Sequence, residues 1–224
     1  QGLNLMRYDL KNYSSIFKVG TGTGSFNVFS YNVVFGRNSI SQPIFPRSGS
    51  DVSLSMELTP PYSLFDSRDY TTLDENSKYK MVEFYKWKLN SSFYVETVNK
   101  LVLAARLKFG FLGYYNNEIG VTPFQRFYLG GDGLSGYNNL DGREIIGMRG
   151  YGNETITPFY YEDKNIGGNI FTKYTLELRY PFSLNPSATI YGLGFLEAGN
   201  SWLGFDSFNP FDVKRSAGFG VRVF

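Results

Sequence analysis

The fold of this chain is decided by the stretch Lys173-Tyr174-Thr175-Leu176-Glu177-Leu178-Arg179-Tyr180. Apolar and polar side chains alternate along it with a period of two residues, so that tyrosine and leucine share one face while charged and hydroxyl-bearing residues share the other. This alternation predicts a β-strand whose two faces meet different surroundings. On the apolar face two tyrosines flank two leucines, and aromatic residues around an aliphatic centre are typical of strands that face lipid.

The same alternation recurs along the chain and predicts an all-β fold with about seven antiparallel strands. One of them, Met81–Val95, is longer than a typical strand of a globular protein. Another, Leu101–Phe111, carries Arg106 and Lys108 on one face, where two cations need water or partners. The expected strands are Phe26–Arg37, Val52–Leu58, Met81–Val95, Leu101–Phe111, Lys173–Tyr180, Thr189–Ala198 and Ser216–Phe224.

The connections between the expected strands alternate between short and long. Outer-membrane barrels have this asymmetry, with short turns at one end and long loops at the other. A soluble β-sandwich or a small ligand-binding barrel also alternates and stays open as an alternative. Short turns are expected at 45–49, 97–99 and 183–186, and long connections at Pro60–Lys78, Asn116–Gly168 and Asn200–Lys214.

The composition also favours a membrane barrel. Aromatic residues make up 18% of the 224 residues, with 18 Tyr and 21 Phe, whereas only 19% are charged. The longest apolar runs, such as Leu101 to Ala105, fall far short of the roughly 20 residues that a spanning helix needs. The closed barrel is the other spanning fold that satisfies its backbone hydrogen bonds in hydrocarbon. The chain is therefore expected to form part of a transmembrane antiparallel β-barrel.

Charge and residue usage limit the possible partners and chemistry. The net charge of +2 is small and no basic run is interleaved with aromatic residues, so no nucleic-acid partner is expected. Without Cys there is no disulfide, zinc site or thiol nucleophile, and without His the commonest general base and metal ligand is missing. We expect a non-enzymatic protein with no catalytic residues, no metal and no cofactor.

The longest connection, Asn116–Gly168, spans about 50 residues without strong alternation, and loops of this length are either disordered or functional. Within it a strand-like run ends in the pair Gly130-Gly131, and Met148-Arg149-Gly150-Tyr151 follows further on. Glycine pairs permit a close approach of backbone to backbone, and an arginine beside a glycine can be presented at a tight turn. The content of this loop therefore indicates an ordered, functional segment.

These segments resemble the BamA-like outer-membrane assembly factors of the barrel insertase superfamily, from about Phe26 onward. In that family an aromatic pair and a Gly-Gly precede a Val-Arg-Gly-Phe/Tyr motif at the tip of a loop that folds back into the barrel lumen. Here these read Phe127-Tyr128-Leu129-Gly130-Gly131 and Met148-Arg149-Gly150-Tyr151, with Met148 in place of Val. The spacer 132–146 is longer than in the best-known members and is similar to Bacteroidetes-like versions.

Three further segments carry the resemblance. Gly36–Ser50 looks like the family's strand followed by a Phe-Pro-x-x-Gly turn. Phe195–Trp202 resembles its Asp-Ala-Gly-Asn-x-Trp segment, with Glu197 in place of Asp, and Arg215–Arg222 resembles the Arg-x-Ser-x-Gly-x-Gly strand that follows. Each match alone is weak, but four matches in the right order are specific.

The resemblance implies a domain organisation. Residues 1–224 would cover roughly strands eight to fourteen of a barrel of about sixteen strands, with the loop 116–168 folding inward. The periplasmic POTRA domains and the final strands would lie outside this chain. Phe224 would then be a point at which the chain stops short of the end of the barrel.

The resemblance also implies a latch for the loop motif. In the family, acidic residues at the places of Glu177 and Glu197 hold the motif arginine, here Arg149, inside the barrel. The planar guanidinium of an arginine favours bidentate pairing with carboxylates. On this basis, removal of the Arg149 charge is expected to loosen the loop and weaken assembly, and removal of Glu177 alone to be milder.

The residue pattern supports the two carboxylates unequally. Glu177 lies on the polar face of its expected strand, whereas Glu197 shares its parity with Tyr191, Leu193 and Phe195 and is placed in the lumen by the resemblance alone. Two plainer alternatives stay open: Arg149 as an exposed loop arginine, and Glu177 as a solvated carboxylate paired with a cation of its own strand, Lys173 or Arg179.

The function implied by the resemblance is that of an outer-membrane protein assembly factor, the barrel component of the BAM complex that folds and inserts β-barrel proteins into the bacterial outer membrane. Its partners would be unfolded outer-membrane barrel substrates, accessory lipoproteins of the complex and outer-membrane lipid. Such a barrel templates incoming strands by β-augmentation at a seam between its first and last strands, so the present stretch would carry the wall and the lumen plug. One alternative is a two-partner-secretion or translocation-assembly relative that exports polypeptides, and a second is a passive porin.

Overall fold

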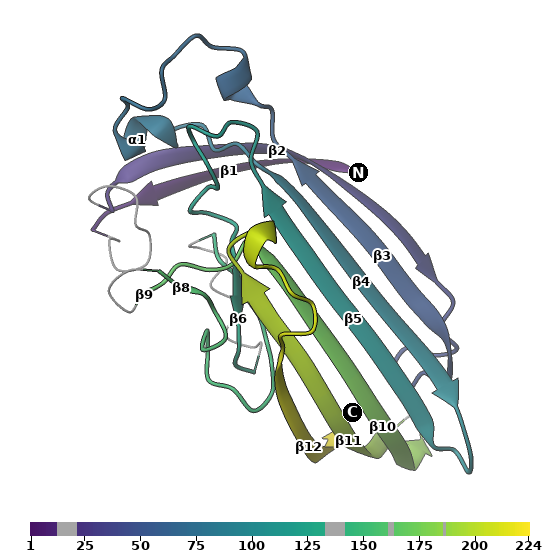
Figure 1. Ribbon diagram of the computed structural model, residues 1–224. Helices are drawn as coiled ribbons and strands as arrows, with labels where there is room; N and C mark the ends of the chain where they lie inside the picture. The colour runs from purple at the N-terminus through teal and green to yellow at the C-terminus, as the bar shows by residue number, and fades with distance from the viewer. Residues whose placement is uncertain (13–21, 133–141, 161–163, 186) are drawn as a thin grey trace.

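A computed structural model describes residues 1–12, 22–132, 142–160, 164–185 and 187–224 (Figure 1). Its main element is a curved eight-stranded sheet in which every neighbouring pair is antiparallel. The strands, in the order in which they lie in the sheet, are β1 (Gly2–Leu10), β2 (Gly24–Asn38), β3 (Ser48–Leu58), β4 (Tyr85–Glu96), β5 (Val102–Gly113), β10 (Ile170–Asn185), β11 (Ala188–Trp202) and β12 (Lys214–Val223).

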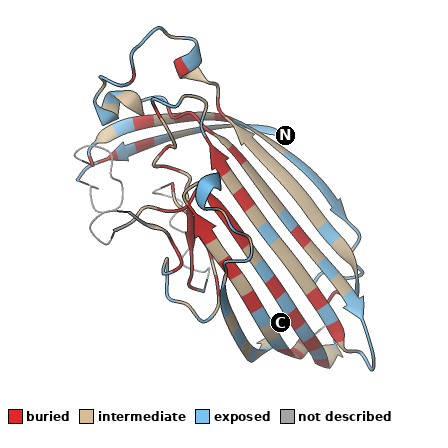
Figure 2. Cartoon of the chain, in the orientation of Figure 1, coloured by how far each residue is buried: buried red, intermediate tan, exposed pale blue. Residues whose placement is uncertain are grey.

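Burial on the sheet is inverted relative to a soluble protein. Along β10 the polar residues Thr175, Glu177 and Arg179 are buried, whereas Leu176 and Leu178 are exposed, and the two classes alternate along the strand (Figure 2). In water a sheet buries its apolar face, because apolar area is what water excludes. A sheet that covers its charged face and exposes its leucines has the pattern of a barrel wall between lipid and lumen.

The sheet holds one strand more than the seven expected, and the additional strand is β1. Its apolar residues change parity: Leu3 and Leu5 are exposed on one face, whereas Tyr8 and Leu10 are buried on the other. This change hides the strand from a count of period-two matches. It arises because only the second half of β1 lies against the core formed with the inward loop.

The strand expected at Met81–Val95 begins later, at Tyr85. The residues before it complete the free edge of β2 instead: the backbone N–H of Val82 donates to the carbonyl of Asn27 at 2.9 Å, and the N–H of Asn27 donates to the carbonyl of Lys80 at 2.9 Å. Val82 and Phe84 are fully buried there. Val82 and Phe84 have the opposite parity to Met81 and Tyr85, so the alternation that predicted the strand changes at its start, where the chain leaves the sheet register and packs into the core.

The expected alternation of short and long connections is confirmed. The shorter connections, 39–47, 97–101 and 186–187, join β2 to β3, β4 to β5 and β10 to β11, whereas the long connections lie at the opposite end of the strands (Figure 1). The turn expected at 45–49 begins earlier than predicted, because β3 already starts at Ser48. These long connections carry the short helices η1 (Tyr62–Leu64), α1 (Glu75–Lys78) and η4 (Phe205–Ser207). Among the described residues, no helix is long and apolar enough to cross a membrane.

The long loop runs from residue 114 to residue 169, slightly wider than the expected 116–168, and it folds against the inner face of the sheet (Figure 1). Most of its expected insertion 132–146 lies outside the described residues. The loop contains two small pairs of strands, and only β6 was indicated by the sequence, as the strand-like run before Gly130-Gly131. They are β6 (Phe127–Leu129) with β7 (Glu144–Ile146), which are parallel, and β8 (Phe159–Tyr160) with β9 (Lys164–Asn165), which are antiparallel.

The main hydrophobic core lies between this loop and the inner face of the strands. Sheet residues such as Phe26, Val28 and Leu112 pack with loop residues such as Phe124 and Phe127. A smaller cluster lies near the short turns, where Phe45 packs edge-on against Tyr191 with ring centroids 5.0 Å apart. The loop is therefore a structural part of the wall, because it provides six of the fourteen buried residues that the structure describes in this core.

Candidate functional site: the inward loop and its ion-pair cluster

The glycine pair and the arginine motif of the loop lie side by side. The N–H of Met148 donates to the carbonyl of Gly131 at 2.8 Å, and the N–H of Gly131 donates to the carbonyl of Tyr151 at 3.1 Å. Gly130 has a φ of +126°, and a Cβ added there would lie 2.4 Å from the carbonyl oxygen of Gly152. The pair is therefore needed for a backbone approach that any larger residue would prevent.

Arg149 projects from this turn onto the wall. One of its guanidinium nitrogens, Nη2, lies 2.8 Å from Oε1 of Glu177 and 2.8 Å from Oε1 of Glu197, and its backbone N–H donates to the other oxygen of Glu197 at 2.8 Å. The guanidinium carbon also lies 3.7 Å from the ring centroid of Phe195, in the geometry of a cation–π contact. The structure thus brings together all three residues of the expected latch.

Glu177 is the centre of a larger cluster. Its side chain is fully buried and, besides Arg149, contacts Arg179 at 2.5 Å, Arg222 at 3.3 Å and Arg106 at 3.4 Å. These arginines come from β5, β10 and β12, so one carboxylate joins several strands of the wall to the loop. The alternative in which Glu177 is solvated is wrong, because the side chain is buried. The pairing with Arg179 that this alternative proposed is present.

Glu197 holds a second part of the cluster. Besides Arg149 it contacts Lys173 at 3.1 Å and the hydroxyl of Thr175 at 3.3 Å. Lys173 also donates to the carbonyl of Gly147, at 2.6 Å, and so ties the wall to the loop backbone. Tyr191 and Leu193, which share the parity of Glu197, are buried on the same inner face. Glu197 therefore shares the inner face of β11 with apolar side chains, which explains why its neighbours in the sequence pattern are apolar although it faces the lumen.

Sequence reasoning missed Arg106, Arg222 and the hydroxyl of Tyr151, which donates to the carbonyl of Arg215 at 2.8 Å. Arg106 was noticed only as a cation that needs a partner, and Arg222 only as part of a strand motif. Each lies on the inward parity of its strand, and that parity was the available signal. Which carboxylate they meet depends on the registers of β5 with β10 and of β11 with β12, and no local pattern reveals those registers.

A second ionic contact joins the wall to the part of the loop around β6 and β7, which we call its base, while the turn that carries Met148–Tyr151 is its tip. At the base the signs of the charges are reversed: the loop supplies the carboxylate and the wall supplies the cations. Glu144 of β7 lies 2.6 Å from Nζ of Lys86 and 3.1 Å from Nζ of Lys88, both on β4. The ammonium of Lys86, which is almost fully buried, also donates to the backbone carbonyl of Gln125 at 2.9 Å. Burial acts to raise the pKa of Glu144, but Lys86 and Lys88 outweigh it, and the pKa is held below its usual value.

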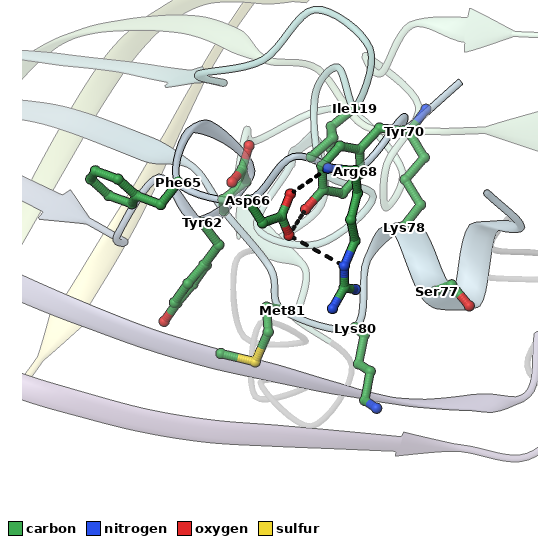
Figure 3. A pocket seen from close by; sticks show the side chains of 11 residues that line it. Tyr62, Phe65, Asp66, Arg68, Tyr70, Ser77, Lys78, Lys80, Met81 and Ile119 are labelled. Atoms are coloured by element: carbon green, nitrogen blue, oxygen red, sulfur yellow. Dashed lines mark hydrogen bonds and ion pairs between the residues drawn. The ribbon is translucent and has the colours of Figure 1, made fainter. Parts of the chain in front are cut away.

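A separate cavity of about 400 Å³ lies in the long β3–β4 connection, away from the loop motif (Figure 3). Asp66 at its wall accepts a hydrogen bond from the hydroxyl of Tyr70 at 2.8 Å and contacts Nε of Arg68 at 3.5 Å. Burial and this hydrogen bond raise the pKa of Tyr70 to about 12. Asp66, Arg68 and Tyr70 at this cavity are therefore engaged with one another.

The residues of the loop site hold the loop against the wall through ion pairs and hydrogen bonds. In the part of the chain that the structure describes, no group of three or more carboxylates could hold a metal ion. The ionisable side chains of the cluster are arginines, a lysine and two carboxylates in mutual contact. Charge-assisted, multidentate pairs of this kind fix geometry more strongly than neutral hydrogen bonds do.

The fold and this site define a class: the wall of an antiparallel membrane β-barrel with a long loop folded against its inner face and latched there by an arginine. A family model, described as the Omp85 superfamily domain, matches residues 2–223. The chain belongs to the Omp85 superfamily.

Comparison with solved structures is consistent with this membership. The crystal structure of BamA from Haemophilus ducreyi lacking POTRA domains 1–3 matches with a TM-score of 0.61 and 21% sequence identity, over 88% of this chain. The present chain spans 36% of the length of that structure, so the likeness concerns the fold of part of its barrel. No curated protein matches the sequence significantly.

Proposed function

We propose that this chain is part of an outer-membrane assembly factor, the non-enzymatic barrel that folds and inserts other β-barrel proteins into the bacterial outer membrane. The observation that carries the proposal is the latch: within an Omp85 fold, Arg149 at the tip of the inward loop contacts two carboxylates of the wall at 2.8 Å. Unfolded barrel proteins, accessory lipoproteins and outer-membrane lipid are the proposed partners.

Two further features support this proposal. The loop and its core cover the inner face of the sheet, which suits a plugged barrel better than an open pore. The cluster joins β5, β10, β11 and β12 through two carboxylates, which stiffens this part of the wall. A stiff wall suits a protein whose moving part is a seam elsewhere in the barrel.

The test is a folding assay with purified full-length protein in liposomes. An unrelated barrel protein is added unfolded, and its folding is followed by gel mobility and by protection from protease. We expect the wild-type protein to accelerate folding and Arg149→Ala to lose most of the acceleration. Arg47→Ala, which removes a partly exposed arginine from a short turn, is the matched control.

The outcomes separate the competing functions. If wild-type protein leaves the folding rate unchanged, the insertase proposal is wrong. A steady, large conductance in planar bilayers would point to a porin. Export of a supplied polypeptide into the liposome interior, without its insertion into the bilayer, would point to a secretion barrel.

A further inference from the structure

The connection between β11 and β12, residues 203–213, folds back over the wall, and we call it the outer flap. Ile170 of β10 is paired with Phe111 of β5 and with Trp202 of β11, so these three side chains share one face of the sheet. Phe171, the next residue of β10, has the opposite parity and packs in the core with the inward loop. The flap contacts the first face, which is the outward face of the wall (Figure 1).

Aromatic rings join the outer flap to the wall. The ring centroid of Phe205 lies 4.7 Å from that of Phe111, and the ring of Phe208 lies edge-on to that of Trp202 with centroids 5.0 Å apart. Ile170, which lies between the two wall residues, is fully buried although it has the outward parity. The flap therefore takes the place of lipid as the covering of this end of β5, β10 and β11.

The flap also meets a polar side chain of the outward face. The amide nitrogen of Asn200 donates to the carbonyl of Asp212 at 2.7 Å. Asn200 lies two residues, about 7 Å along a strand, from Ala198, which is paired with the exposed Tyr174. A polar group so close to the lipid-facing residues is costly unless it is hydrogen-bonded. The flap thus lies at the border of the apolar belt and supplies a partner there.

The surface of the flap that points away from the wall carries exposed phenylalanines. Phe211 is 84% exposed and Phe205 is 58% exposed. A turn fixes Phe211, because its N–H donates to the side-chain oxygen of Asn209 at 3.0 Å, and the N–H of Asp212 donates to the carbonyl of Asn209 at 3.1 Å. An aromatic side chain presented in this way is unfavourable in water, which excludes apolar area. The flap therefore offers a shaped apolar surface.

Polar residues alternate with the phenylalanines along the flap. Exposed carboxylates and an amide stand between or beside the rings, in the order Phe205-Asp206-Ser207-Phe208-Asn209-Pro210-Phe211-Asp212. Mixed aromatic and polar surfaces suit the interface of a membrane, where one end of a group is apolar and the other is wet. The flap continues the outward face that exposes Tyr174 and Leu176. The surface that it meets is therefore the bilayer around the barrel.

We propose that the outer flap is a membrane-interface anchor, with Phe205 and Phe211 in the acyl region of the facing leaflet and the polar residues of the flap among the headgroups. The flap is fixed to the ends of β10 and β11, so it sets the depth at which these strands lie in the bilayer. The proposal requires the barrel to span a membrane, but it does not require the assembly activity.

The test measures the depth of single labels in the full-length protein, reconstituted at low density in phosphatidylcholine vesicles. Residues 1–224 contain no cysteine, so a nitroxide is attached to Phe211→Cys, to Leu176→Cys on the outward face of β10, or to Thr72→Cys, which is exposed in the β3–β4 connection. Collisions with oxygen, which enters hydrocarbon, are compared with collisions with a polar nickel chelate, which stays in water. We expect about tenfold fewer nickel collisions at Phe211→Cys than at Thr72→Cys, because hydrocarbon excludes polar solutes.

A second variant tests whether the phenylalanines hold the flap in the bilayer. Phe211→Asp is expected to raise the nickel collisions of a label at Phe205→Cys by about threefold, because a carboxylate is unfavourable at the edge of the hydrocarbon. Val98→Asp is the matched control, since Val98 is as exposed as these residues but lies in the short turn between β4 and β5 at the other end of the strands. It should leave the label at position 205 unchanged.

Three results would overturn the proposal. Equal nickel collisions at Phe211→Cys and Thr72→Cys would place the flap in water. Protection of the Phe211→Cys label from both oxygen and nickel would show that protein covers the flap, as in contact with a second copy of the chain. Free access of nickel to Leu176→Cys would show that the wall itself lies outside the bilayer. Failure of the folding assay with the Phe211→Cys label still in the bilayer would count against the assembly function alone.

Discussion

The tip and the base of the inward loop are both fastened to the wall, but by different physical means. At the tip the loop supplies the cation, Arg149, and the wall supplies the carboxylates Glu177 and Glu197. At the base the loop supplies the carboxylate, Glu144, and the wall supplies Lys86 and Lys88. The base contributes Phe124, Phe127, Leu129 and Ile146 to the main hydrophobic core, whereas the tip contributes Met148, Ile156 and the partly buried Tyr151.

This difference predicts different responses of the two ends. Apolar burial stabilises by about 25 cal/mol per Å² and involves no titrating group, so the base is expected to stay packed when its ion pair is weakened. The tip depends on a cluster in which five cations surround two carboxylates. The tip is therefore the end that a single substitution can release.

The largest effect is expected for Glu177→Gln. The change leaves Arg179 buried without a carboxylate, and breaking a buried pair in this way costs about 3–5 kcal/mol. Glu96→Gln, at an exposed pair with Arg47 at 3.9 Å, should cost under about 1 kcal/mol. Urea unfolding of the reconstituted protein measures both. Equal unfolding midpoints for the two variants would contradict a central role for Glu177.

The burial and the four arginine partners of Glu177 predict that its loss costs more folding stability than the loss of Arg149. The expectation that loss of Glu177 is the milder change for the loop and for assembly stays a prediction. Arg149→Ala is expected to cost about 2–3 kcal/mol, because its side chain is 29% exposed and the carboxylates keep other cations. Limited proteolysis should then cut between residues 147 and 156 while residues 124–129 stay protected. Cleavage at both ends at the same rate would mean that the loop detaches as a whole.

Gly130→Ala tests the turn that presents the motif. The new Cβ would meet the carbonyl oxygen of Gly152 at 2.4 Å and hold a φ of +126°, so we expect a loss of about 2 kcal/mol. Gly120→Ala has a φ of +69° and open space around the Cβ, so it should show the backbone strain alone, about 1 kcal/mol. Thermal unfolding of the two variants separates the clash from the strain, and an equal loss would exclude the clash.

The smallest effect is expected from acidification at the base. Because the pKa of Glu144 is lowered in the folded protein, its contribution is complete above the usual carboxyl pKa of 4.5 and is lost as the pH falls through the lowered value. The loss should be about 1 kcal/mol, since Lys86 keeps the acceptors of Gln125. Unfolding temperature is measured against pH for the wild type and Glu144→Gln. The difference between them should vanish in acid, and a constant difference would refute the assignment.

Most of the wall was predictable because its signal is local. Each of the seven expected strands is present, since period-two alternation reports the two faces of a strand whatever its neighbours are. β1 escaped because its second half is covered by the loop, and the covering segment is about 100 residues away in the chain. The strand expected from Met81 begins at Tyr85, because the residues before it pair with β2 and place Val82 and Phe84 in the core.

By itself the sequence determined the alternating strands, the uneven connections, the glycine pair and the arginine motif of the loop, because each of these depends on residues close together in the chain. Only the tertiary structure decided that Arg106 and Arg222 meet Glu177 and that Glu144 meets Lys86. These contacts depend on strand register and on how the loop folds inward. Strand register and the path of the loop both depend on many contacts between residues far apart in the chain. No short stretch of sequence specifies those contacts.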